Sequence, residues 1–104
     1  MAHDLTEKTA GLASRVDNLV ALETGDDSRA LEALQERLEK RTLASIVANL
    51  HDSEKKYQDA VAALDNATDI IGEADHQIQN ISKAIKLIAK AADLVEAAIK
   101  AAAK

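Results

Sequence analysis

The sequence contains no cysteine, proline, tryptophan or phenylalanine, and it holds only three glycines and a single aromatic residue, Tyr57. The absence of cysteine excludes disulfide bonds and thiolate chemistry, and it leaves the redox compartment open. β-Branched and aromatic residues favour strands, whereas alanine, leucine, glutamate and lysine favour helices. Because 22 of the 104 residues are alanine and 30% are charged, the composition predicts one all-α domain with a thin core.

Two kinds of hydrophobic segment are also missing. No apolar run follows a basic start at the N-terminus, so we expect no cleaved secretory signal. No uncharged stretch reaches the ~18 residues that a transmembrane helix needs. The sequence therefore predicts a cytoplasmic protein, and secretion by a route without a cleaved signal is compatible with it.

One strong break interrupts the first half, in the stretch ETGDDSRALEAL. Gly25 suits the positive φ that often follows a helix, and Asp26, Asp27 and Ser28 are candidates for capping the next helix. Leucine and valine recur at helical spacing on both sides, which predicts an antiparallel hairpin whose facing residue numbers add to 50. In this register the facing pairs are Leu12 with Leu38, Val16 with Leu34 and Leu19 with Leu31.

From Leu43 onward, apolar residues recur every seven residues almost to the end of the chain. The first position of this repeat holds Leu43, Leu50, Tyr57, Leu64, Ile71, Ile78, Ile85, Ala92 and Ile99. The fourth position holds Ile46, Ser53, Ala60, Ala67, Ala74, Ile81, Ile88, Val95 and Ala102. Such a pattern is typical of the seam of a coiled coil or an antiparallel bundle.

Side-chain size predicts that the repeat folds back on itself near Gly72. With a bend around residues 72–75, facing residue numbers add to 148 or 149, so that Ala60 faces Ile88 and Tyr57 faces Ala92. Small residues opposite large ones allow two helices to pack closely. We therefore expect Gly72 to end a helix and Asp75 to cap the next one.

The distribution of charge points to the same hairpin. Residues 57–82 hold five acids and no lysine or arginine, whereas residues 83–104 hold five lysines and two acids. Antiparallel packing would place these opposite charges side by side, with Asp93 opposite Lys55 and Lys56. Exposed ion pairs are each worth only about 0–1 kcal/mol, so they fix the register more than they stabilise the fold.

The expected fold class is an all-α arrangement of antiparallel helical hairpins, with helices at about 4–23, 27–72 and 76–103. The stretch ANLHDSEKK leaves the middle open, because Asp52 or Ser53 could cap a new helix. The chain then forms either three helices with a long central one, or a four-helix bundle if the middle bends near residues 50–53.

Motifs for catalysis or cofactor binding are scarce. Glu73 and His76 have the spacing used in carboxylate-bridged di-iron bundles, but such sites need two of these motifs and two further glutamates. His51 beside Asp52 could form half of a base dyad, yet no motif places a nucleophile nearby. The sequence has no glycine-rich phosphate loop and no zinc-ligand spacing. We expect no enzyme activity, no catalytic residues, and no metal or cofactor.

Nucleic acid is an unfavourable partner, because the net charge is −5 and residues 1–82 carry 8 basic against 16 acidic side chains. The basic cluster of Arg37, Lys40 and Arg41 lies among glutamates. Pairing of residues four apart on a solvated helix face explains that cluster.

The predicted function is a non-catalytic helical protein-interaction or assembly module that associates with itself or with a protein partner. Its candidate partner surface consists of apolar residues that the seam leaves out, namely Val47, Val61, Ile70, Leu87 and Leu94. An alternative comes from residues 81–104, a cationic amphipathic helix that could bind the surface of an anionic membrane. The same segment could instead pack in the core, with its lysines pairing with the aspartates of the preceding helix.

Overall fold

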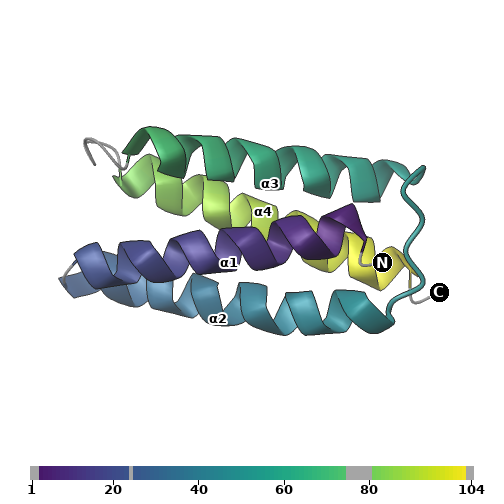
Figure 1. Ribbon diagram of the computed structural model, residues 1–104, viewed down its shortest axis with the longest axis horizontal. Helices are drawn as coiled ribbons and strands as arrows, with labels where there is room; N and C mark the ends of the chain where they lie inside the picture. Colours follow the sequence, from purple (N-terminus) through teal and green to yellow (C-terminus); the bar gives the residue numbers. More distant parts are fainter. Residues whose placement is uncertain (1–2, 24, 75–80, 103–104) are drawn as a thin grey trace.

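The computed structural model describes residues 3–23, 25–74 and 81–102. These residues form four helices, α1 (Asp4–Leu22), α2 (Gly25–Val47), α3 (Lys55–Ala74) and α4 (Ile81–Ala102). The helices α1 and α2 form one antiparallel hairpin, and α3 and α4 form a second one (Figure 1). The predicted fold class of antiparallel helical hairpins is confirmed, in its four-helix form.

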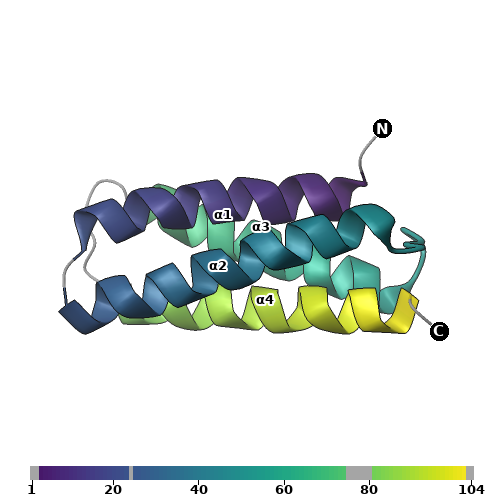
Figure 2. The same ribbon diagram turned by 90° about the horizontal axis from the view of Figure 1, so that it is seen from below.

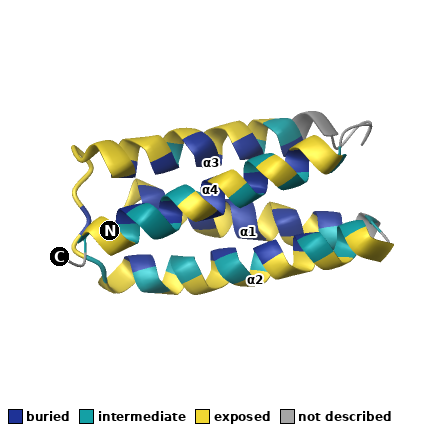
Figure 3. Ribbon diagram, turned by 180° about the vertical axis from the view of Figure 1, so that it is seen from behind, coloured by how far each residue is buried: buried dark blue, intermediate teal, exposed yellow. Residues whose placement is uncertain are grey.

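The second hairpin lies on the first, with α1 beside α3 and α2 beside α4 (Figures 1 and 2). The start of α1 contacts Tyr57 in α3, and Lys8 further along α1 binds Asp65 with an Nζ to Oδ1 distance of 2.6 Å. Residue numbers in α1 and α3 therefore increase in the same direction along the bundle. These two helices are parallel to each other, and α2 and α4 run in the opposite direction. Buried residues line the sides on which the four helices face one another (Figure 3).

The segment between Val47 and Lys55 is not helical, so the continuous central helix over residues 27–72 is not formed. Leu50 is buried and anchors this connection at the end of the core. The Glu54 N–H donates to the His51 carbonyl at 3.1 Å, and the Glu54 carbonyl accepts the Gln58 N–H at 3.0 Å. Glu54 therefore occupies the position that precedes the first helical residue, and the prediction that Asp52 or Ser53 would do so is wrong.

The turn between α1 and α2 depends on a left-handed glycine. Gly25 has φ +67°, as predicted for this position, and such a conformation is costly for residues with a Cβ. The Glu23 N–H donates to the Leu19 carbonyl at 3.0 Å at the end of α1. Ser28 donates its hydroxyl to the Val20 carbonyl at 3.2 Å, so this side chain ties α2 to the end of α1.

The register of the first hairpin agrees with the prediction. Hydrogen bonds between α1 and α2 join Val20 with Ser28, Asp17 with Gln35 and Thr6 with Ser45. The residue numbers of these pairs add to between 48 and 52, around the predicted 50. The six leucine and valine residues of the predicted pairs are all buried.

The register of the second hairpin differs from the prediction. Since α3 ends at Ala74 and α4 begins at Ile81, facing residue numbers add to about 155 rather than 148 or 149. Tyr57 and Ala98 accordingly line the same pocket at one end of the bundle. A shift of about seven residues is one period of the repeat, so apolar residues face each other in both registers.

The principle of small residues opposite large ones holds in this shifted register. Five buried residues of α3 face five buried residues of α4 of the opposite size, namely Tyr57 with Ala98, Ala60 with Val95, Leu64 with Ala91, Ala67 with Ile88 and Ile71 with Ala84. The sixth buried pair, Ala63 with Ala92, is small on both sides.

The helix α3 runs through Gly72 and ends at Ala74. The prediction that Gly72 ends a helix is therefore wrong by two residues, although the chain does fold back after it. Asp75, the predicted cap of the next helix, lies outside the described residues, and so does His76.

Tyr57 of α3 completes the first turn of α1. The residue before α1, His3, makes no side-chain hydrogen bond to the helix. The Leu5 N–H donates instead to the Tyr57 hydroxyl at 3.2 Å, and this hydroxyl lies 3.4 Å from His3 Nδ1. A donor that the helix itself cannot satisfy thus finds its acceptor in the other hairpin.

Candidate functional site

Three large apolar side chains are exposed at the end of α2. Leu43 is 69% exposed, Ile46 64% and Val47 86%. Residues three and four apart lie on the same face of a helix, so these side chains form one continuous surface, here called the α2 stripe. Leu43 and Ile46 were predicted to lie in the seam, and that prediction is wrong.

Leu43 and Ile46 are exposed because the buried face of α2 continues the phase of its earlier leucines. Leu31, Leu34 and Leu38 are buried, and Ser45, seven residues after Leu38, is buried next. At about 100° per residue, Leu43 is turned by about 140° from Leu38, so it points away from the core. The helix keeps the phase that its leucines set and buries a serine in place of Leu43 and Ile46.

Hydrogen bonds make the burial of Ser45 possible. Its hydroxyl oxygen lies 2.8 Å from Thr6 Oγ1, and it donates to the Thr42 carbonyl at 2.7 Å. A buried hydroxyl with partners avoids the desolvation cost of an unpaired one. The result is a polar pair inside the hairpin and an apolar stripe outside it, the reverse of what folding alone favours. Such local conflicts are typical of functional positions.

The α2 stripe continues toward α1. Leu43 lines a shallow groove of about 480 Å³ between these two helices. The α1 side of this groove is made of Ala10, Ala13, Ser14 and Asp17, and Gln35, Glu39 and Thr42 lie with Leu43 on the α2 side. An apolar side chain of a partner could therefore rest between Leu43 and α1.

The five predicted surface residues do not gather in one place. Val47 belongs to the α2 stripe, whereas Leu87 and Leu94 line a groove of about 350 Å³ between α3 and α4. Val61 lines a third groove with His3 and Asp4 at the start of α1. Ile70 is half-buried, and it packs against the core, as do Val61, Leu87 and Leu94.

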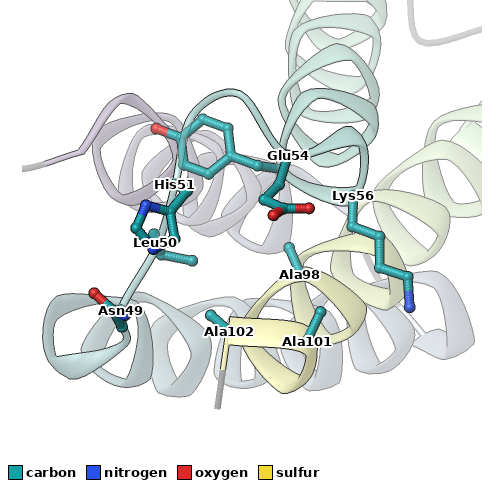
Figure 4. A pocket seen from close by; sticks show the side chains of 9 residues that line it. Asn49, Leu50, His51, Glu54, Lys56, Ala98, Ala101 and Ala102 are labelled. Carbon is teal, nitrogen blue, oxygen red and sulfur yellow. The ribbon is translucent and has the colours of Figure 1, made fainter. Parts of the chain in front are cut away.

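A pocket of about 210 Å³ opens at the end of the bundle where α2 gives way to α3 (Figure 4). His51, Glu54 and Lys56 lie at its rim, and alanines of the last turns of α4 form the opposite side. Among the described residues that line this pocket there is no serine, threonine or cysteine. Asp52 lines the groove at the start of α1 instead, so the His51 and Asp52 pair does not converge on one cavity.

An ion-pair network joins α2 to α4. Arg37 donates to Asp93 and to Glu96 at 2.8 Å, and Arg41 donates to Glu96 at 3.1 Å. The hydrogen bond from Arg37 lowers the pKa of Glu96 below its ordinary value, against the opposing effect of burial. These contacts contradict the expected pairing of Asp93 with Lys55 and Lys56. Within the basic cluster only Lys40 pairs as expected, with Glu36 at 3.7 Å.

The C-terminal helix α4 is a core helix in this structure. Its apolar face is buried through Ala84, Ile88, Ala91, Ala92, Val95 and Ala98. Lys83, Lys86 and Lys90 are exposed on the other side. The three described aspartates of α3, Asp59, Asp65 and Asp69, form no ion pair with these lysines, so the expected pairing between the two helices is not seen for them.

Within the described ranges, no three histidine, aspartate or glutamate side chains gather in a way that could hold a metal ion. No helix in the same part of the chain has the length and hydrophobicity to cross a membrane. Glu73 lies near the end of α3, and His76, three residues further on, is outside the described residues. Comparisons with protein-family models, with curated proteins and with solved structures found no match.

Proposed function

We propose that this protein is a non-catalytic helical interaction module that associates with a second copy of itself through the α2 stripe. The exposure of Leu43, Ile46 and Val47 on one helix face carries this proposal. Amphipathic helices dock on partners through apolar anchors at this spacing of three and four residues.

The energetics support a partner for this surface. Full burial of a leucine, isoleucine or valine side chain is worth about 1.5–3 kcal/mol relative to full exposure. The three side chains of the α2 stripe are each more than half exposed, so most of that free energy is unused in a single chain. Association would recover it, whereas contiguous apolar surface without a function is a liability for aggregation.

Binding to a membrane surface is the alternative, through the helix at residues 81–104. The apolar face of α4 is buried against the other helices, so this helix would have to leave the bundle before that face could enter a bilayer. The exposed lysines of α4 could attract anionic lipids without such a change, but only through charge. The burial of the apolar face supports association between proteins over this alternative.

The proposal is tested by measuring molar mass in solution over a range of concentrations by light scattering. We expect the mass to rise above that of one 11.1 kDa chain at micromolar concentration. The double variant Leu43→Asp with Val47→Asp should remain a monomer, because it places two charges on the apolar surface. The control Ala33→Asp adds a charge at an exposed position of the same helix outside the α2 stripe, and it should associate like the wild type.

Two results would count against the proposal. One is a wild-type chain that stays monomeric at all concentrations, and the other is association that Leu43→Asp with Val47→Asp does not weaken. Pelleting with anionic phosphatidylserine vesicles, with loss of helix packing detected by hydrogen exchange in α4, would favour the membrane alternative instead.

A further inference from the structure

We draw no further inference here: the strongest candidate, the apolar groove between α3 and α4 that Leu87 and Leu94 line, carries nothing, because nothing in the described part of the structure shows what covers it.

Discussion

At the scale of single residues, paired hydroxyl groups allow the first hairpin to bury polar side chains. Thr9 and Thr42 donate to the carbonyls four residues before them, at 2.7 and 2.8 Å, so their hydroxyls are satisfied within their own helices. Ser45 and Thr6 pair across the hairpin. No buried side-chain nitrogen or oxygen in the described part of the chain lacks a partner. The first hairpin can therefore bury a layer of hydroxyl groups, because each of them has a hydrogen-bond partner.

The coupling between Thr6 and Ser45 can be measured with a double-mutant cycle. Ser45→Ala should lower the free energy of unfolding by about 1–3 kcal/mol, because it leaves the buried Thr6 hydroxyl without its partner. Thr6→Val should cost less, since Ser45 still donates to the Thr42 carbonyl. The double variant should be more stable than the sum of the two single effects predicts, by about 1 kcal/mol. Urea denaturation followed by circular dichroism gives all four values, and additive effects would show that the hydroxyls do not interact.

At the scale of elements, the sequence is sufficient to predict the first hairpin but not the register of the second. Leucines and valines that face one another in α1 and α2 fit one register well, and the left-handed Gly25 fixes the turn. In α3 and α4 the apolar residues repeat every seven residues, so a slip by seven restores an apolar match. The residues at which α3 ends and α4 begins, Ala74 and Ile81, decide between the registers. The sequence between them contains no proline or other residue that marks where a helix must stop.

Cross-linking can check the register of the second hairpin, because the chain has no native cysteine. Asn66 and Lys90 line the same groove, so the variant with cysteines at both positions should cross-link readily with a short thiol-reactive reagent. The matched variant with cysteines at Asn66 and Lys83 tests the register in which facing numbers add to 149. Lys83 and Lys90 share a helix face about 10 Å apart, so this second variant should react much more slowly. Faster reaction of the 66 and 83 pair in dilute protein, read by mass spectrometry, would mean that the predicted register is correct.

The candidate surface was the part least accessible to sequence reasoning. Of the five predicted residues, only Val47 lies on the α2 stripe, because Leu43 and Ile46 were assigned to the seam. The signal that could have placed them outside is the spacing of five residues from Leu38 to Leu43, which breaks the repeat. A reading that continued the phase of Leu31, Leu34 and Leu38 would have reached Ser45 and left both side chains on the surface. A buried serine is hard to predict before its partner, Thr6, is known.

At the scale of the whole molecule, ion pairs help to hold the two hairpins together. Arg37 and Arg41 in the first hairpin bind Glu96 in the second, and Lys8 binds Asp65 on the other side of the bundle. Because the pKa of Glu96 is lowered in the folded state, mainly by its hydrogen bond with Arg37, the unfolded chain takes up this proton first as the pH falls. The contribution of Glu96 to stability is thus present above the ordinary pKa of a glutamate, about 4.3, and it is lost as the pH falls through the lower folded value.

Stability measured against pH should reveal this contribution. Glu96→Gln should be less stable than the wild type at pH 7, and the difference should shrink steadily as the pH falls from about 5 toward 3. Glu32→Gln is the control, since it makes the same chemical change at an exposed position of α2. Its difference from the wild type should stay small throughout this range. Unfolding in urea at each pH supplies the comparison, and a Glu96→Gln difference that stays constant with pH would contradict the role given to the ion pair.

The hydrogen bond from Leu5 to Tyr57 has a consequence for the order of folding during synthesis. The residues of α1 leave the ribosome before those of α3, and the acceptor for the Leu5 N–H lies 52 residues further along the chain. His3 gives the first turn of α1 no side-chain cap, and the ends of helices fray. We therefore expect the Leu5 N–H to gain this acceptor only after α3 has been made and has docked on α1. Of these two helices, the one that is synthesised earlier closes its first turn later.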